Sequence, residues 1–393
     1  MDDETFQNSS AGRVVQAIGG HHAFVPNPLP PQIVWSAALV HVLSEADRAV
    51  GYLAGLGQIL PNPYLLIRPL QRQEAVLSSR IEGTQASLSD LYAYEGGRQV
   101  ADQALADDVH EVHNYVQALE YGLEQVYAGM PVSLRLIREL HAILMGGIRG
   151  AWTAPGEFRR VQNWIGPPGC CLEEAVFVPP PPEAMMAALD AWEQFLHAPS
   201  NVPPLVRLAL IHYQFETIHP FLDGNGRVGR LLLVLLLAAW DVLPQPLLYL
   251  SAYLERRRQM YYALLLEVSQ HGAWEAWLRY FLRGVAEQSR VTVIQGQRLL
   301  ALHAAYRRAY SDSSKMLALI ALLFENPLIT GPMVVQQLDV SSATAYQYLA
   351  TLENDGVLQE ITGRQRGRRY MAREILHAIE DSELEEASPY GIP

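Results

Sequence analysis

The strongest constraint on the fold is the apolar run LLLVLLLAAW at Leu231–Trp240. It is about half as long as a helix that crosses a bilayer, so we expect a helix buried on all sides by the rest of the chain and no membrane partner. The chain can supply that cover, because half of its 393 residues are apolar and only 18% are charged. This length allows two or three domains with a sizeable core.

Apolar residues recur at helical spacing over most of the chain, which predicts a mainly α fold. Residues 1–32 are rich in Gly and Pro and are expected to form an extended lead-in. Two short apolar runs around a Pro/Gly turn predict a β-hairpin at 163–178. Helices are expected at 33–60, 69–87, 104–127, 134–145, 183–196 and, with breaks, from 204 to about 310.

The charge balance narrows the classes of partner. The chain has 29 Lys and Arg against 41 Asp and Glu, so nucleic acid is not expected to contact its whole surface, although a local basic patch stays possible. Its two cysteines, Cys170 and Cys171, are neighbours, which excludes a disulfide framework. The acidic, polar start MDDETFQNSS is unlike a secretory leader and predicts a cytoplasmic protein.

The segment His219–Arg230, HPFLDGNGRVGR, has the composition of an anion-binding loop. Gly224–Gly226 accept positive φ angles, so that successive N–H groups can converge on an anion. A helix expected from Arg227 onward points its positive end at the same place. Arg227 and Arg230 are three residues apart, so both can reach a polyphosphate from one helix face.

Three other side chains of this segment suit the same chemistry. Asp223 offers a hard oxygen ligand for Mg²⁺, and His219 has an ordinary pKa suited to a general base. Phe221 is the residue that we expect to anchor the loop in the core. The alternative is a plain interhelical turn with a structural histidine, but so many features within one short loop ahead of a buried helix favour a ligand site.

The loop resembles the signature of the Fic family, HPFx[D/E]GNGRxxR, with every defined position matched. The resemblance extends to AGRVVQAIGG…FVPNPLPP near the start, to NYVQAL at 114–119 and to QNWIG…AVFVPPPPE at 162–183. It implies a Fic-type helical core with a β-hairpin flap. It also implies the activity of most members, which use ATP and Mg²⁺ to place AMP on a Ser, Thr or Tyr hydroxyl of a protein target.

The resemblance implies a role for each residue of the loop. His219 would deprotonate the target hydroxyl, Asp223 would hold Mg²⁺, and Arg227 and Arg230 would take the β- and γ-phosphates. Tyr261 and Tyr262 lie where the family places a tyrosine pair near adenine, although tyrosines at helical spacing are often core residues; Ser269 replaces an adenine-contacting Asn of some relatives. The nucleotide-binding residues implied are Gly224, Asn225, Gly226, Arg227, Val228, Gly229, Arg230, Tyr261 and Tyr262.

The resemblance also assigns the hairpin at 163–178 as the flap that pairs with an extended segment of the target. The flap residues expected to contact the target are Ile165, Gly166, Val176 and Phe177. An ordinary surface hairpin is the alternative.

An inhibitory motif of the family, [S/T]xxxE[G/N], is matched by Ser78, Glu82 and Gly83. Ser78 and Glu82 share a helix face, and Gly83 permits close approach at the helix end. A glutamate aimed at Arg230 would occupy the guanidinium meant for the γ-phosphate and turn ATP away from attack. In a de-AMPylating enzyme, the alternative activity, the same glutamate would position a water.

Two charged stretches favour plain structural interpretations. The segment His110–His113 reads H-E-x-H and lacks the H-E-x-x-H spacing of zinc helices, so we expect two ordinary helix histidines. The segment Glu255–Arg258 is expected to be a solvated helix face, with contact to phosphates as the alternative.

Residues 315–375 predict a winged helix, with Ser341–Asn354 in the place of a recognition helix. Over 312–380 there are six basic residues against eight acidic ones, so positive charge is confined to the wing, at arginines 364, 366, 368, 369 and 373. These could meet DNA phosphates; the alternatives are recognition of protein targets and support of a homodimer.

The expected organisation is an N-terminal region with the inhibitory helix (1–105), a Fic catalytic domain (106–310), the winged helix (311–380) and an acidic, disordered tail (381–393). The function expected is self-inhibited protein adenylylation. The alternative from another class is a DNA-binding regulator whose Fic core senses nucleotide. The target protein and the oligomeric state do not follow from the sequence.

Overall fold

The computed structural model describes residues 3–17, 20–60, 62–97, 102–147, 154–167, 169–364 and 367–381. Arg366 of the expected wing and all of the expected tail except Asp381 lie outside these residues. Within them the protein is mainly helical with small antiparallel sheets, as the sequence predicts.

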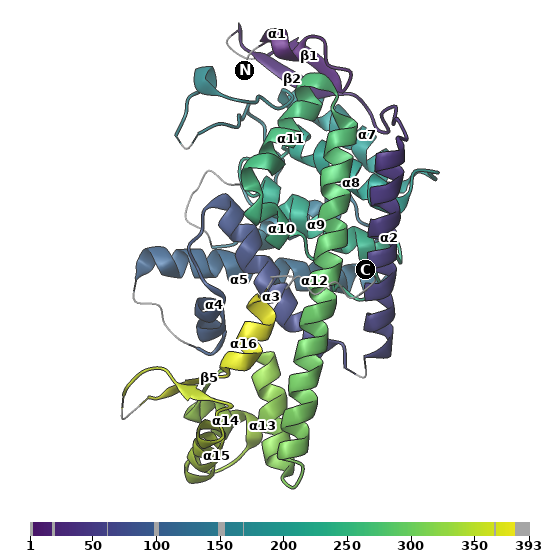
Figure 1. The fold of residues 1–393 in the computed structure, drawn as a ribbon. Coiled ribbons are helices and arrows are strands. Elements are labelled where there is room, and N and C mark those ends of the chain that lie inside the picture. Colours follow the sequence, from purple (N-terminus) through teal and green to yellow (C-terminus); the bar gives the residue numbers. More distant parts are fainter. Residues whose placement is uncertain are drawn as a thin grey trace.

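The longest helix, α12 (Trp274–Ala309), runs along most of the molecule (Figure 1). Helix α2 (Ala37–Ile59) packs along it, and the α2 N-cap Ser36 donates a hydrogen bond to Glu275 at 2.6 Å. The predicted start at residue 33 is therefore too early, since Ser36 has extended backbone angles and caps the helix with its own side chain.

The buried apolar helix is α9 (Asn225–Ala239). Its residues Leu231–Leu237 are at most 3% exposed, which confirms the prediction from the apolar run. Trp240 is the C-cap and lies outside the helix. Helices that pack around it include α3 (Tyr64–Glu82), α5 (Gln103–Tyr127), α6 (Leu134–Leu144) and α8 (Pro204–Ile218).

Helix α3 begins and ends earlier than its predicted bounds of 69–87. Pro69 lies inside the helix rather than at its start. Gly83 stops the helix in a left-handed conformation, with φ at 117°. Ser87 then caps a separate helix, α4 (Leu88–Glu95), through a capping box with Asp90. Three more helices complete this part of the chain: α7 (Pro182–His197), α10 (Ser251–Arg256) and α11 (Arg258–His271).

The N-terminal segment forms a β-hairpin after the short helix α1 (Asp3–Phe6), so the prediction of an extended lead-in is wrong for this part. Strands β1 (Gly12–Gln16) and β2 (His22–Pro26) pair antiparallel, with Gly12 opposite Pro26. The Phe24 N–H donates to Val178 O at 2.9 Å, so β2 also lies beside the end of the expected flap.

Among its described residues, the expected flap hairpin has one β-bridge, between Ile165 and Phe177. Pro167 has no N–H to extend the ladder on one side, and residues Leu172–Glu174 form a 3₁₀ turn on the other. The two arms of the predicted hairpin therefore meet where expected, with their pairing limited to this bridge among the described residues.

The C-terminal residues form a compact unit at the end of α12 (Figure 1). Its strands pair antiparallel in the order β3-β5-β4. The elements are α13 (Ser314–Glu325), β3 (Leu328–Thr330), α14 (Gly331–Leu338), α15 (Ser342–Asn354), β4 (Gln359–Glu360), β5 (Arg369–Met371) and α16 (Arg373–Glu380).

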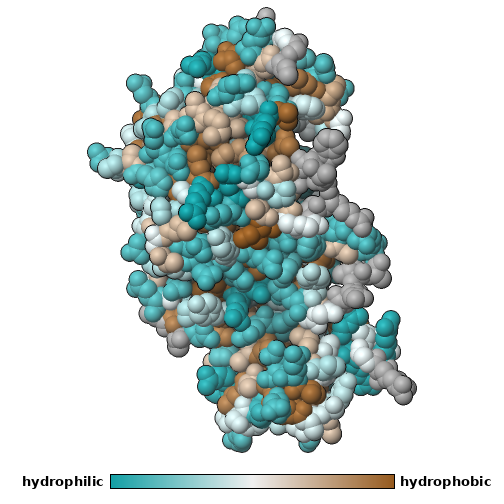
Figure 2. Space-filling model, turned by 180° about the vertical axis from the view of Figure 1, so that it is seen from behind, coloured by the Kyte–Doolittle hydropathy of each residue, from teal (hydrophilic) through white to brown (hydrophobic). Residues whose placement is uncertain are grey.

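On the face shown in Figure 2, polar residues predominate and apolar ones are scattered in small groups. In the described part of the chain, none of the helices combines the length and the apolar character that a bilayer crossing requires.

Candidate active site

The loop between α8 and α9 is shaped by two residues in the left-handed region. His219 ends α8 with φ at 50° and ψ at 62°, and Gly224 precedes α9 with φ at 77°. Helix α9 begins at Asn225, two residues before the predicted start at Arg227. The loop is therefore a tight turn whose residues face the amino end of a buried helix.

Phe221 anchors this loop in the core, as predicted. Its side chain is fully buried, and its ring stacks on that of His141 with centroids 3.7 Å apart. The Asn225 side chain closes the turn: its Oδ1 accepts from Phe221 N–H at 2.8 Å and its Nδ2 donates to Phe221 O at 2.9 Å. Asn225 thus has a clear structural task in the loop.

His141 of α6 is a loop-supporting residue that the sequence analysis missed. Its Nδ1 accepts from Gly156 N–H at 2.9 Å, so its Nε2 carries the proton and donates to Asp223 O at 3.0 Å. Burial lowers the pKa of His141 to about 4, which keeps this neutral tautomer at neutral pH. A single histidine in an amphipathic helix has no spacing that would reveal this role.

His219 is half-buried and points its Nδ1 at Glu216 O, 3.1 Å away, so Nδ1 must donate. This leaves the Nε2 lone pair available for a proton. Burial lowers the pKa of His219 to about 4, and the nearby Arg159 charge acts in the same direction. The imidazole is therefore neutral near pH 7, as a general base must be before it acts.

Arg159 and Asn163 hold the backbone of His219, and the sequence analysis missed both. Arg159 Nε and Asn163 Nδ2 donate to His219 O at 2.9 and 3.1 Å. Arg159 also donates to Pro180 O at 2.6 Å, and Asn163 to Phe221 O at 3.0 Å. These contacts join the root of the flap arms to the loop.

Asp223 is the acidic residue of the loop, and 58% of its side chain is accessible. Its Oδ1 accepts from Gly224 N–H at 2.6 Å, and its Oδ2 lies 3.6 Å from Arg227. One accessible carboxylate fits Mg²⁺ bound together with phosphate oxygens and waters. Within the described ranges there is no cluster of three or more His, Cys, Asp or Glu that could hold a metal by protein ligands alone.

The two arginines of the loop have different partners. Arg227 is 2% exposed, and its Nη1 contacts Glu111 Oε2 at 2.8 Å. Glu111 belongs to the H-E-x-H stretch, so the acidic residue of that stretch reaches the site. His113 instead packs edge-on against the Tyr94 ring.

Arg230 is 1% exposed and lies against the end of α3. Its Nε donates to Ser78 Oγ at 2.8 Å, and its Nη2 donates to Ser78 O at 2.9 Å and to Glu82 Oε1 at 2.6 Å. Burial alone would raise the pKa of the Glu82 carboxyl, but the Arg230 charge outweighs it and holds that pKa below its ordinary value. A Cβ at Gly226 would lie 2.3 Å from Glu82 Oε1, so this approach requires a glycine.

A second carboxylate of α3 ties the helix to α10. Glu74 is 2% exposed and accepts from Ser251 Oγ at 2.6 Å and from Ser251 N–H at 3.1 Å. Glu74, Ser78 and Glu82 follow one another at intervals of four residues, so they lie along one face of the helix.

The remaining predicted nucleotide residues divide between packing and exposed positions. Tyr261 is 1% exposed, with its hydroxyl bonded to His212 Nε2 at 2.9 Å, so it is a core residue. Tyr262 is 40% exposed beside it. Val228 is fully buried, and a Cβ at Gly229 would lie 2.3 Å from Glu216 Oε1.

The predicted flap residues likewise include both exposed and buried positions. Ile165 N–H donates to Phe177 O at 2.8 Å, and Val176 N–H donates to Ile165 O at 2.9 Å. Val176 is 48% exposed, whereas Phe177 packs against Phe6 and Phe24 and is nearly buried. A Cβ at Gly166 would meet Cys170 Sγ at 2.6 Å.

Two further positions named in the sequence analysis have partners within the protein. Ser269 Oγ is bonded to Tyr213 OH at 2.8 Å in the core. Arg256 and Arg257 form ion pairs with Glu287 of α12 at 3.0 and 3.1 Å, so the expected solvated face at Glu255–Arg258 is partly an interhelical contact.

Comparisons with known proteins agree with this geometry. Residues 40–124 match the Fic/DOC family N-terminal model, and residues 131–237 match the Fic/DOC family model. The chain is 28% identical over 219 residues to protein adenylyltransferase Fic of Drosophila grimshawi, a match over 54% of this chain and 40% of the relative. It is 30% identical over 159 residues to the Drosophila yakuba protein of the same name, over 40% of this chain and 30% of the relative. The chain thus spans two fifths or less of these relatives.

Solved structures show the same fold. A Fic family protein from Desulfovibrio desulfuricans superimposes with a TM-score of 0.56 at 21% identity, over 88% of this chain and 98% of that one. Fic-1 of C. elegans superimposes with a TM-score of 0.53 at 24% identity, over 68% of this chain and 74% of that one. Residues 40–124 and 131–237 therefore match the two Fic/DOC family models, and the fold is similar to that of solved Fic proteins.

Proposed function

We propose that the protein is a self-inhibited protein adenylyltransferase that transfers AMP from ATP to a Ser, Thr or Tyr hydroxyl of a protein target. The observation that carries the proposal is the convergence of His219, Asp223 and Arg230 around the amino end of α9. The name of the Drosophila relatives supports the reaction class.

The proposed AMP transfer uses the neutral imidazole of His219 as its general base. Its Nε2 takes the proton of the target hydroxyl, and the hydroxyl oxygen forms a bond to the α-phosphorus of ATP. The bond from the α-phosphorus to the bridging oxygen breaks, and pyrophosphate leaves. Arg159 and Asn163 fix the His219 backbone, so the base is held in place before substrate arrives.

The phosphates would lie at the amino end of α9. The unpaired amides there and the positive helix end attract anions, and Arg230 supplies a charge that stays on at all relevant pH values. Mg²⁺ held by Asp223, when bound, supplies charge neutralisation for the leaving pyrophosphate. Arg227 is held by Glu111 and lies beside the Asp223 carboxylate.

Glu82 would inhibit the enzyme by occupying Arg230. An ion pair at 2.6 Å competes directly with a γ-phosphate for the same guanidinium. An extended segment of the target would pair with the flap beside the exposed Val176, and such main-chain pairing recognises an extended segment more than a particular sequence.

Label transfer tests the proposal. Transfer from ATP labelled at the α-phosphorus, with none from ATP labelled at the γ-phosphorus, is expected for Glu82→Gly with a protein lysate. Transfer of the γ-label would indicate a kinase, and transfer of neither label would favour a nucleotide-sensing regulator. Labelling that persists in the double variant Glu82→Gly, His219→Ala would exclude His219 as the base.

We infer that residues 314–371 form a winged helix, on the basis of three helices and an antiparallel three-stranded sheet around a core that includes Ile320, Val334, Leu349 and Tyr370. Arg364 and Arg368 are exposed on the connection between β4 and β5. Binding of the full chain to duplex DNA, weakened by Arg368→Glu and by added salt, would support DNA as the partner. Equal binding of duplex DNA by the wild type and Arg368→Glu would favour a protein target or a homodimer as the role of these residues.

A further inference from the structure

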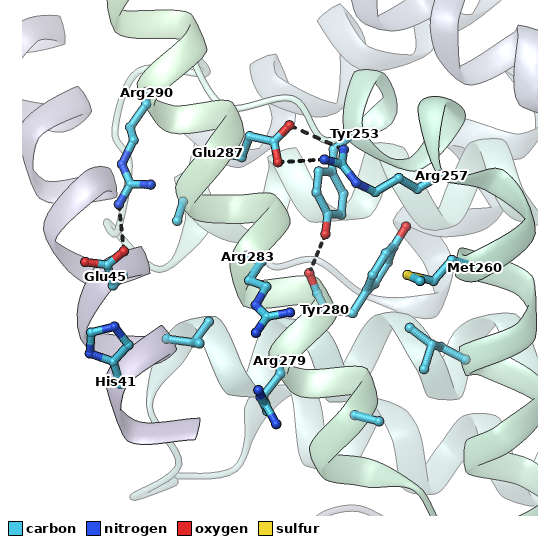
Figure 3. Close-up of a pocket in the computed structure, with 14 residues that line it drawn as sticks. His41, Glu45, Tyr253, Arg257, Met260, Arg279, Tyr280, Arg283, Glu287 and Arg290 are labelled. Atoms are coloured by element: carbon cyan, nitrogen blue, oxygen red, sulfur yellow. Dashed lines mark hydrogen bonds and ion pairs between the residues drawn. The ribbon is translucent and has the colours of Figure 1, made fainter. Parts of the chain in front are cut away.

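A cavity of about 760 Å³ lies between α2, the junction of α10 and α11, and α12 (Figure 3). Its volume is within the range of small-molecule sites. None of its lining residues belongs to the α8–α9 loop, so it is separate from the proposed active site.

Positive charge dominates this cavity. Four arginines and two glutamates line it, in a chain whose net charge is −12. Arg290 is paired with Glu45 at 3.0 Å, and Arg257 with Glu287 at 3.1 Å. The other two arginines are Arg279 and Arg283 on α12.

The remaining two arginines lack strong partners. Arg279 lies 3.8 Å from its nearest carboxylate, Glu275, and its Nε is buried without a hydrogen bond in the described part of the protein. For Arg283 no ion pair or hydrogen bond is found among the described residues. Figure 3 shows both side chains extending from α12 into the space between the helices. Their donors are therefore available to an anion.

A buried hydroxyl adds an independent observation. Tyr280 lines the cavity and is 5% exposed, yet its hydroxyl has no hydrogen-bond partner within the described residues. Buried polar groups of this kind are nearly always paired, so the hydroxyl indicates that a group from outside the chain completes the site.

Apolar side chains also line the cavity, among them Val42 of α2 and Leu264 of α11. The cavity thus offers apolar surface for a ligand body and separate cations for its charged end.

We propose that this cavity binds a phosphorylated small molecule of nucleotide size. Arg279 and Arg283 of α12 offer donors that lack strong partners, and Arg257, which is paired with Glu287 at the junction of α10 and α11, adds positive charge from a second direction; this arrangement suits the tetrahedral array of phosphate oxygens. A planar carboxylate is satisfied by a single guanidinium fork. The site is independent of the proposed reaction, and its test does not depend on activity.

The test measures binding to the full chain by calorimetry, with inorganic pyrophosphate and citrate as phosphate and carboxylate probes. Arg283→Glu should weaken pyrophosphate binding at this site by about tenfold or more, because it replaces an attractive charge by a repulsive one. Arg308→Glu, an exposed position on the same helix, is the matched control and should bind as the wild type does.

Localisation separates this site from the active site, which pyrophosphate would also enter. Arginine modification by phenylglyoxal, read by peptide mass spectrometry, should show Arg279 and Arg283 protected by pyrophosphate and by ATP. Absence of protection at both arginines would overturn the proposal. Stronger protection by citrate than by pyrophosphate would overturn the phosphate assignment.

Tyr280→Phe gives a second test that does not depend on charge. Since the hydroxyl has no protein partner in the described residues, its removal should leave the melting temperature equal or higher. It should weaken pyrophosphate binding several-fold. Affinities that are equal in the wild type, Arg283→Glu and Tyr280→Phe would overturn the proposal.

Discussion

Replacing Glu82 by Gly should release the enzyme, and the structure indicates by how much. The substitution removes the 2.6 Å contact to Arg230 Nη2 but keeps both contacts of Arg230 with Ser78. Charge-assisted hydrogen bonds are worth about 1.5–3 kcal/mol. Because a third of the Glu82 side chain is exposed, solvent screening places this contact in the lower part of that range, near 2 kcal/mol. An interaction of that size shifts the fraction of free Arg230 by roughly 30-fold.

The assay is the initial rate of AMP incorporation from α-labelled ATP into protein, at ATP concentrations below saturation. Glu82→Gly should exceed the wild type by roughly 30-fold, on the same free-energy conversion. Glu82→Gln is the matched control, since it keeps the length and hydrogen-bonding capacity of the side chain and removes only its charge. Its rate should lie between the other two.

The reasoning is refuted if folded Glu82→Gly protein, checked by its melting temperature, incorporates AMP at the wild-type rate. A rate for Glu82→Gln equal to that of Glu82→Gly would show that the charge alone inhibits. A rate for Glu82→Gln equal to that of the wild type would show that side-chain volume, not charge, blocks the site.

Three further outcomes are expected. The pKa of Glu82 lies below its ordinary value, so the Glu82–Arg230 ion pair is fully formed above the ordinary carboxyl range and is lost only as pH falls through the lowered pKa. The ratio of the Glu82→Gly rate to the wild-type rate should therefore be constant between about pH 6 and pH 8. A ratio that falls within this range would contradict the ion pair. The pKa of His141 is lowered to about 4, so as pH falls the unfolded state binds a proton on this histidine before the folded state does, which lowers the free energy of unfolding. Urea unfolding should therefore show a smaller loss of stability between about pH 6.5 and pH 4 for His141→Gln than for the wild type. Phe221→Ala should lower the free energy of unfolding by about 3–5 kcal/mol in urea titrations, because a fully buried ring stacked on His141 is lost; a change near zero would mean that the loop is not anchored there.

Much of the loop could be predicted because its information is local. The apolar run required a buried helix, and Gly224 just before it permitted a turn with positive φ, so the position of α9 followed from adjacent residues. Gly83 gave a similar signal for the end of α3, although the predicted bounds carried that helix on to residue 87. Boundaries without such signals were missed, as with Pro69, which lies inside α3 rather than at its start.

The partners of the loop could not be predicted, because they act across long separations in the chain. His141, Arg159 and Asn163 donate to backbone carbonyls of the loop, and a carbonyl is offered by every residue. Glu111 is 116 positions from Arg227, and nothing in its helix distinguishes it from a surface glutamate.

The pairing of short strands also could not be predicted from the sequence. The hairpin of β1 and β2 depends on cover by Phe177 and on the bond from Phe24 to Val178, both from the distant flap region. The division of the tyrosine pair likewise depends on tertiary contacts, since Tyr261 is buried against His212 of α8 and Trp277 of α12 while Tyr262 is 40% exposed.

The position of Glu82 on α3 has a consequence for the time course of the reaction. The helix is buried along its length and packs against α5, α9, α10, α13 and α16, so moving it as a body would expose core surface. Glu82 is the last helical residue and can rotate alone, a motion of nanoseconds to microseconds. Turnover takes milliseconds or longer in most enzymes. Under the proposed mechanism, inhibition and release would therefore equilibrate many times per catalytic cycle, and progress curves should begin without a lag when ATP is added.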